Sequence, residues 1–336
     1  MIETTLVAES ESMSWKITSR AAHAGYPLAA KLLRFHLMRC PIRLGKPQLL
    51  GLWFDLMNWR RNYTFTACSN QGIQFRLNMV DSVGSHVFLT GMWESGITEL
   101  MLTLLRPGDT FIDVGANIGY DSLLAAKLVG PHGSVLSVEP APHLCEALEY
   151  NLALNPDLAA LRNITLLPYC ASDRSGTVVL SALAEGNSGE TTLRKLSEGS
   201  HTMKVAARPL DEMLSEVDLS RCQLLKMDIE GAEHLAVIGM ERTLDRYPAI
   251  SLMLEVDDHF LHDLGSSAGQ LIDWFTRRGY QGYVIDAPRA NLDGAPVVLR
   301  PCQGAPLSPE NVLFTRQPER FAMWIKTTAP SCGVVC

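Results

Sequence analysis

Long apolar runs are missing from this chain of 336 residues. No stretch of about 18 uncharged apolar residues occurs, so a helix that crosses a membrane is not expected. The N-terminus also lacks the basic start and apolar centre of a secretory signal. Hydrophobic residues make up 47% of the chain and charged residues 19%, which is typical of a globular protein. We therefore expect a folded, cytoplasmic protein.

The eight cysteines are scattered, and no Cys-x-x-Cys pair occurs among them. This pattern argues against both a disulfide framework and a zinc site, and it predicts reduced thiols.

Positive charge is concentrated near the N-terminus, where residues 1–61 hold nine Lys/Arg against four Asp/Glu. Because the whole chain carries −7, the remainder carries −12, and an acidic body argues against nucleic acid as the main partner. The basic segment 1–60 has two interpretations. The segment could contact a membrane surface or an anionic substrate. Alternatively, it could form an amphipathic helix that packs on the body.

Strand and helix patterns alternate through the rest of the chain. A hairpin is expected over 63–77 and a helix over 94–105, followed by short apolar strands that alternate with helices. The expected strands are 110–114, 133–139, 164–169, 223–228, 250–255, 282–285 and 311–315. Such alternation predicts a mostly parallel, Rossmann-like α/β sheet with helices on both faces. We divide the chain into the extension 1–60, a domain over 61–320 and a tail over 321–336, and we expect a strand pair with a loop within 176–205.

A glycine turn joins the first of these strands to its helix, in the sequence Asp113-Val-Gly-Ala-Asn-Ile-Gly119. Glycine lets the backbone approach a ligand closely, and the helix that follows presents free N–H groups. A dinucleotide site favours Gly-x-Gly-x-x-Gly, but Asn117 stands where the middle glycine would fall. The spacing of Gly115 and Gly119 therefore favours a nucleoside cofactor whose anionic part is a carboxylate. Asp113 would face the amino group of the same amino-acid moiety.

Two acidic residues follow the next strands. Glu139 lies 24 residues beyond Gly115, at the spacing at which a carboxylate accepts the hydroxyls of an unphosphorylated ribose. Asp173 is expected to contact an adenine amino group, although its Ser-Asp-Arg-Ser-Gly setting is also ordinary turn chemistry.

A second motif, Lys226-Met-Asp-Ile-Glu-Gly-Ala-Glu233, ends the fourth strand. Asp228 is expected at the sheet's carboxyl edge, where it would bind the cofactor's amino acid, orient the acceptor or take its proton. Glu230 is a further candidate base, and Glu233 fits a structural and a functional role equally well.

More carboxylates and a histidine follow the fifth strand. His259 is a candidate base at neutral pH. Glu255, Asp257 and Asp258 could join Asp228 around a hard cation, but acidic loop residues are more often a solvated rim, and we expect no metal.

Together these motifs resemble the FkbM family of S-adenosylmethionine-dependent methyltransferases. The resemblance covers roughly residues 85–315. The matching stretches are 108–120, 138–140, 151–155 and 225–233. It implies a seven-stranded methyltransferase sheet whose last strand is antiparallel, and it places Glu94 near the cofactor. It also implies O-methylation of a small hydroxylated acceptor such as a sugar, a glycolipid or a polyketide-type molecule.

Two rival functions remain at this stage. One is a nicotinamide-dependent oxidoreductase on the same kind of sheet, and the other is a non-catalytic binding protein with a methyltransferase fold.

Overall fold

The structure is a computed structural model. It describes Leu33, His36, Leu37, Leu49 and residues 64–78, 81–182, 191–194, 200–287, 296–302 and 309–325. The predicted role of the basic segment 1–60 therefore concerns residues that lie almost wholly outside this part, as do most of those in the predicted tail. Within the described residues no helix is both long and apolar enough to cross a membrane.

The central sheet has eight strands in the order β13-β12-β14-β11-β10-β3-β4-β5. Their bounds are Thr110–Val114 (β3), Ser134–Val138 (β4), Ile164–Leu167 (β5), Cys222–Met227 (β10), Ser251–Val256 (β11), Gln281–Asp286 (β12), Val298–Pro301 (β13) and Glu310–Thr315 (β14). The five strands from β5 to β11 are parallel, and β14 runs antiparallel to both of its neighbours. The predicted mostly parallel sheet with an antiparallel last strand is confirmed.

The expected count of seven strands was one too few. β13 pairs antiparallel with β12 and adds an eighth strand at the edge. It is only four residues long and ends in a proline, so its local pattern was too short to predict a strand.

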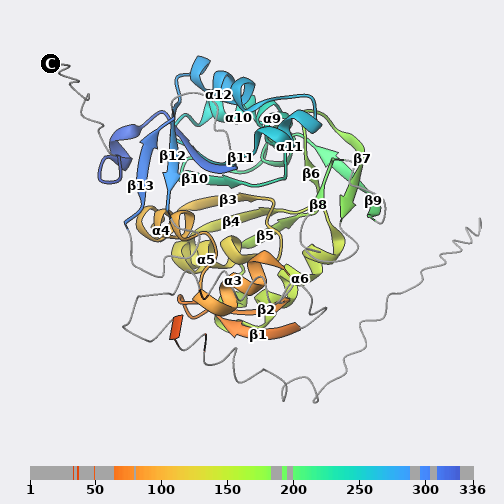
Figure 1. Cartoon of the computed structure of the whole chain (residues 1–336), viewed down its shortest axis with the longest axis vertical. Coiled ribbons are helices and arrows are strands. Elements are labelled where there is room, and N and C mark those ends of the chain that lie inside the picture. The colour runs from red at the N-terminus through yellow and green to blue at the C-terminus, as the bar shows by residue number, and fades with distance from the viewer. Residues whose placement is uncertain are drawn as a thin grey trace, which may run out of the picture.

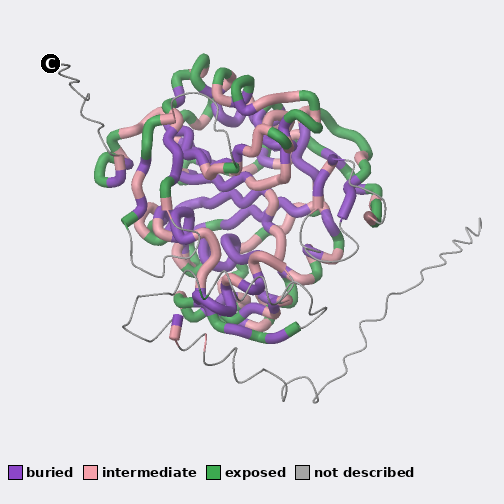
Figure 2. Tube along the Cα trace, viewed as in Figure 1, coloured by how far each residue is buried: buried purple, intermediate pink, exposed green. Residues whose placement is uncertain are grey.

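Helices cover both faces of this sheet (Figure 1). One face carries α4 (Ser95–Leu104), α5 (Tyr120–Val129) and α6 (Pro142–Ala153), and the other carries α9 (Glu233–Ile238), α10 (Glu241–Arg246) and α12 (Ala268–Arg277). Successive strand residues point to opposite faces. In β3, Phe111 accordingly packs in the core on the α5 side and Ile112 in the core on the α12 side. The strands at the centre of the molecule are buried (Figure 2).

Four further helices have bounds within the described residues. They are α3 (Ser82–Thr90), α7 (Pro156–Ala159), α8 (Leu210–Met213) and α11 (Asp258–Asp263), with 3-10 turns at Gly130–His132 and Pro318–Phe321. Beyond the predicted boundary at residue 320, Phe321 and Trp324 are buried in the main core, and the carbonyl of Trp324 accepts a hydrogen bond from the N–H of Leu299 at 2.8 Å.

A second sheet lies between β5 and β10 in the sequence, and we call it the insertion sheet. It contains β6 (Cys170–Ala171), β7 (Gly176–Ala182), β8 (Thr191–Thr192) and β9 (His201–Arg208) in the order β6-β9-β7-β8. The expected strand pair is present as β7 and β9, which pair antiparallel along the whole of β7. In Figure 1 this sheet stands at one side of the central sheet.

The predicted N-terminal hairpin is present as β1 (Thr64–Cys68) and β2 (Gln74–Asn78). Two asparagines of the 151–155 stretch hold it on the body. The side-chain oxygens of Asn151 and Asn155 accept hydrogen bonds at 2.8 Å from the N–H groups of Arg76 and Gln74, respectively. Asn151 also donates its amide to the carbonyl of Ile118 at 2.9 Å, so one side chain ties the hairpin to the glycine turn.

This arrangement predicts a clear stability loss for Asn151→Ala. Asn151 is fully buried, and its removal leaves a backbone donor and a backbone acceptor without a partner. Each such group costs about 1–3 kcal/mol. The loss is measured by denaturant unfolding, with Glu146→Ala on the exposed side of the same helix as the control. Equal unfolding free energies for the two variants would contradict the role of Asn151 in tying the hairpin to the glycine turn.

Candidate functional site

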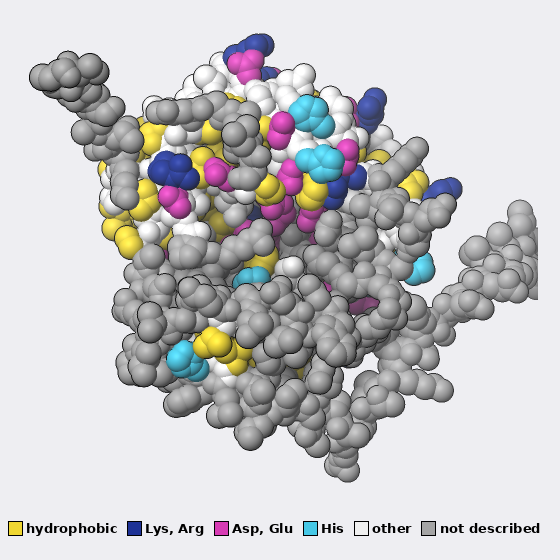
Figure 3. All heavy atoms as spheres, in the orientation of Figure 1, with side chains coloured by type: hydrophobic (Ala, Val, Ile, Leu, Met, Phe, Trp, Pro, Cys, Tyr) yellow, Lys and Arg dark blue, Asp and Glu magenta, His cyan; other side chains and the backbone are white. Residues whose placement is uncertain are grey.

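A cavity of about 290 Å³ lies where the carboxyl ends of β3, β4, β10 and β11 meet. Ligands of open α/β sheets bind at this edge. Among the residues that the structure describes, its charged lining consists of one lysine and eight carboxylates, Asp81, Glu94, Asp121, Glu139, Lys226, Asp228, Glu230, Glu255 and Asp257. In Figure 3 acidic side chains gather at the middle of the face in view.

Three residues of this lining have a strained backbone. Glu94, Asn117 and Glu230 adopt φ angles of 41°, 50° and 55°, in the left-handed region that residues with a Cβ rarely occupy. Strain of this kind persists where the surrounding structure over-determines it, and it clusters at functional sites. The strained backbone and the clustered charges therefore both indicate that this cavity is a functional site.

The glycine turn follows β3 as predicted, and Gly115 and Gly119 have φ angles of 86° and 87°. A Cβ on Gly115 would lie 1.9 Å from the carbonyl oxygen of Asp228, and one on Gly119 would lie 2.8 Å from Leu148. We expected glycine here for close approach to a ligand. The structure adds a second reason, because both glycines let the turn pack against its neighbours in the chain.

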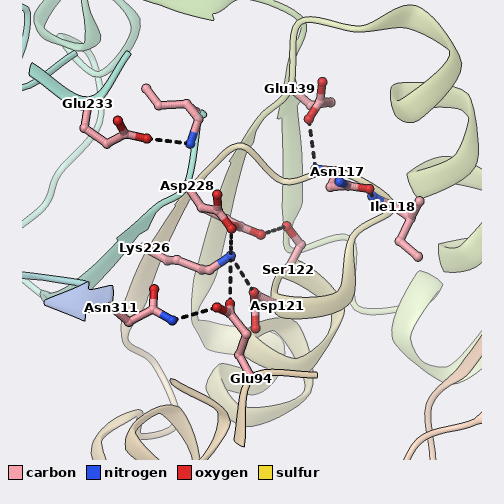
Figure 4. A network of polar contacts seen from close by, with 12 residues as sticks. Glu94, Asn117, Ile118, Asp121, Ser122, Glu139, Lys226, Asp228, Glu233 and Asn311 are labelled. Carbon is pink, nitrogen blue, oxygen red and sulfur yellow. Dashed lines mark hydrogen bonds and ion pairs between the residues drawn. The ribbon is translucent and has the colours of Figure 1, made fainter. Parts of the chain in front are cut away.

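Lys226 is the centre of the polar network in Figure 4. Its Nζ lies 3.1 Å from an oxygen of Asp228, 3.2 Å from Asp121 and 3.5 Å from Glu94. Glu94 also accepts a hydrogen bond of 2.7 Å from the amide of Asn311 on β14. One ammonium group thus joins carboxylates from the starts of α4 and α5 and from the end of β10.

The network shifts the pKa values of its members. Burial alone would lower the pKa of Lys226, but the carboxylates of Asp228, Asp121 and Glu94 raise it well above its usual range. Burial raises the pKa of Asp121 to about 6 against the opposing charge of Lys226. Burial likewise raises the pKa of Glu94. The ammonium stays charged, while Asp121 and Glu94 hold protons more tightly than usual.

Asp113 is not part of the cavity lining, so the structure does not support its predicted contact with an amino group. It is 1% exposed, and its carboxylate accepts a hydrogen bond of 2.5 Å from the hydroxyl of Ser122 in α5. Its side chain lies beneath the first turn of this helix. Asp121, which the sequence interpretation missed, lines the cavity instead, and its place in the turn directly after Gly119 was the available signal.

Glu139 lines the cavity at the end of β4, as predicted. Its two oxygens accept hydrogen bonds of 2.9 Å from the backbone N–H groups of Asn117 and Ala141. Burial raises the pKa of Glu139 to about 7, although these two bonds oppose the shift. A carboxylate oxygen can accept more than one bond, so the contact with a ribose stays a prediction.

Two candidate residues lie outside the cavity. Asp173 turns toward Ser172 and Arg174, and β6 contributes Cys170 and Ala171 to the lining instead. His259 is exposed in the first turn of α11, where its backbone N–H binds the side chain of Asp257. The structure therefore supports neither the adenine contact of Asp173 nor the role of His259 as the base.

Glu233 has a structural role. Its carboxylate is 1% exposed and accepts a hydrogen bond of 2.9 Å from the N–H of Ile229, so it fixes the turn between β10 and α9. Burial raises the pKa of Glu233 to about 7.

Asp228, Glu230 and Glu255 form a carboxylate trio, each offering an oxygen within 4.8 Å of the others. The negative charge of Asp228, followed by burial, raises the pKa of Glu255 to about 10. Glu255 therefore holds a proton at neutral pH, and the oxygens of the trio are also of the kind that a hard divalent cation accepts. Asp257 and Asp258, weighed above as metal ligands, instead accept hydrogen bonds from the backbone N–H groups of His259 and Ala268.

The fold and the cavity define a Rossmann-like α/β protein with a ligand site at the carboxyl edge of its sheet. The sequence profile described as the methyltransferase FkbM domain matches residues 113–281. The chain therefore belongs to the FkbM methyltransferase family.

Among curated proteins, the chain is similar to 31-O-demethyl-FK506 methyltransferase FkbM of Streptomyces tacrolimicus, with 27% identity over 52% of this chain and 74% of that protein. Methyltransferase sdnD of Sordaria araneosa is 31% identical over 40% of this chain and 62% of that protein. A solved structure of methyltransferase FkbM from Methylobacillus flagellatus KT aligns with 68% of this chain and 52% of that one, at 16% identity and a TM-score of 0.39.

Removing the central cation is expected to destabilise the fold. In Lys226→Met three carboxylates lose their partner, and an uncompensated buried charge costs about 3–5 kcal/mol. Protonation of the carboxylates relieves part of this cost, so the loss of Tm should be larger at pH 8 than at pH 6. Thermal unfolding at both values checks this, with the exposed Lys204→Met on β9 as the control. A loss of Tm that does not change with pH would contradict the claim that Lys226 compensates the charges of these carboxylates.

Glu255→Gln should stabilise the ligand-free protein. The pKa of Glu255 is about 10 in the fold and near 4.3 in the unfolded chain. The contribution of its protonation to the free energy of unfolding is therefore fully present at low pH and is lost as pH rises toward 10. A glutamine side chain at this position is neutral at every pH, so it does not have to bind a proton to lie beside Asp228. We expect the Tm of the variant to exceed that of the wild type more at pH 8 than at pH 5, in chelator-containing buffer. Exposed Glu216→Gln is the control, and a matching gain for it would refute the prediction.

Proposed function

We propose that this methyltransferase uses S-adenosylmethionine and transfers the methyl group to a hydroxyl of a small molecule. The observation that carries the proposal is the charge of the cavity, whose lining holds eight carboxylates and one lysine. S-adenosylmethionine is a nucleoside that bears a sulfonium and an ammonium group. A cleft lined by charge of one sign attracts a ligand of the opposite charge, so an acidic pocket favours such a cation.

The same charge argues against the nicotinamide-dependent alternative. The pyrophosphate of a dinucleotide would face the carboxylates of Glu94, Asp121 and Asp228, and within the described part of the lining Lys226 alone would oppose them. Asn117 also occupies the place of the middle glycine that such a site favours. The turn and Glu139 fit the nucleoside part of the methyl donor, with the ribose hydroxyls at Glu139.

The carboxylate trio suits the proton chemistry of O-methylation. When bound, the donor supplies an electrophilic methyl carbon whose bond to sulfur breaks as the bond to the acceptor oxygen forms. A hydroxyl loses its proton in this reaction, and Asp228 and Glu230 of the trio offer carboxylate oxygens at the cavity to take it. A positioned base contributes about 10²–10⁴-fold, and alignment of the reactants contributes about 7–11 kcal/mol.

Apolar side chains also line the cavity, including Trp93, Leu180, Leu193 and Phe260. They suit the carbon skeleton of a sugar, glycolipid or polyketide-type acceptor. The curated relative named for 31-O-demethyl-FK506 supports a hydroxyl as the methylated group.

Transfer of label from methyl-tritiated S-adenosylmethionine tests the proposal. The purified protein is incubated with fractions of small-molecule extracts, and the expected result is a labelled product together with an equal amount of S-adenosylhomocysteine. A protein that neither binds the donor nor labels any fraction would favour the non-catalytic alternative.

Asp228→Asn should retain donor binding and lose most of the turnover, by about 10²–10⁴-fold, because the trio loses the carboxylate that it shares with the Lys226 network. Donor affinity is measured by calorimetry and turnover by the tritium assay. Asp157→Asn, on the exposed side of α7, is the matched control. Wild-type turnover in Asp228→Asn would exclude the aspartate as the base.

A further inference from the structure

The insertion sheet reaches into the cavity through a short segment. Leu180 of β7 and the consecutive residues Thr191, Thr192 and Leu193 line it. Arg194 follows directly and is 7% exposed, although arginine is among the residues that are least often buried. A buried guanidinium calls for specific partners.

Those partners belong to the turn that follows β10 and to α11. The guanidinium of Arg194 lies 3.8 Å from a carboxylate oxygen of Glu230 and 3.6 Å from one of Asp263. It also stacks 3.4 Å above the ring of Phe260. The side chain therefore spans the distance between the insertion sheet and the wall that carries the carboxylate trio.

Thr192 forms hydrogen bonds with both Glu230 and Arg194. Its hydroxyl donates a hydrogen bond of 3.0 Å to the backbone carbonyl of Glu230, and it accepts bonds from the N–H and Nε of Arg194 at 3.1 Å and 3.2 Å. A hydroxyl has one donor and two acceptor positions, and all three are used. Thr192 is 1% exposed, so this pairing is sheltered from water.

The turn that these residues hold is strained. Glu230 has a φ angle of 55°, and strain of this kind costs about 1–3 kcal/mol. On the opposite side, a Cβ on Gly231 would lie 2.5 Å from the carbonyl oxygen of Phe260. The turn is thus held between the insertion sheet and α11, which fixes the direction of the Glu230 side chain.

We propose that Thr192 and Arg194 are positioning residues that hold Glu230 for proton transfer from the acceptor. This inference rests on the proposed function and extends it to the insertion sheet. The donor's nucleoside is assigned to the ends of β3 and β4, whereas Glu230 follows β10, so the two residues should govern reaction with the acceptor and not affinity for the donor.

Three variants test the inference. Arg194→Met keeps the length of the side chain and removes its charge, Thr192→Val removes the hydroxyl at nearly constant shape, and Thr192→Ser retains it. Donor affinity is measured by calorimetry with S-adenosylmethionine. Turnover, KM and their pH dependence are measured with methyl-tritiated donor and the extract fraction that the wild type labels.

We expect turnover to fall about 10²-fold in Arg194→Met and about 10-fold in Thr192→Val, because small misplacement of a reacting group has effects of this size. The affinity for S-adenosylmethionine should stay within about twofold, and Thr192→Ser should retain near wild-type turnover. In Arg194→Met the rise of activity with pH should move to higher pH, because the cation beside Glu230 is gone. Arg174→Met, on an exposed turn of the same sheet, is the control and should change nothing.

Wild-type turnover in both Arg194→Met and Thr192→Val would overturn the inference while leaving the proposed function intact. An equal loss of donor affinity in these variants would also overturn it, because the residues would then serve the donor. If the wild type itself neither binds S-adenosylmethionine nor labels a product, the proposed function fails first.

Discussion

The contact between Lys226 and three carboxylates is the interaction on which the site depends. Asp228, Asp121 and Glu94 come from three separate elements, and without a shared cation their charges would repel one another inside the protein. The ammonium group therefore determines how the end of β10 meets the starts of α4 and α5. It neutralises only part of the negative charge, and the remainder is what makes the cavity suited to a cation.

Strain and close packing hold the rest of the cavity in place. Gly115 lets the turn lie against the backbone of Asp228, and Gly231 lets the next turn lie against Phe260. Glu94, Asn117 and Glu230 accept a strained backbone at the cavity wall, where neighbouring elements fix them. The insertion sheet is one of these elements, so it belongs to the site as much as the central sheet does.

Sequence patterns predicted the parts of this structure that depend on local order along the chain. Alternating apolar strands and helices indicated the sheet, and the spacing from Gly115 to Glu139 placed both residues at its carboxyl edge. Which way a side chain points was harder to predict, since it depends on neighbouring elements. Asp113 turns under α5 toward Ser122, and His259 faces solvent, although both stand beside residues that line the cavity. The roles of Arg194 and Thr192 arise from contacts that span 36 and 38 residues to Glu230, which no local pattern reveals.

In this assignment the acidic cavity, organised by Lys226, binds a cationic nucleoside as its methyl donor. Calorimetric titration of the purified wild-type protein with S-adenosylmethionine, and separately with NAD, tests it most directly. We expect saturable binding of S-adenosylmethionine at one site per chain and no binding of NAD. Binding of NAD, or the absence of any heat with S-adenosylmethionine, would contradict it.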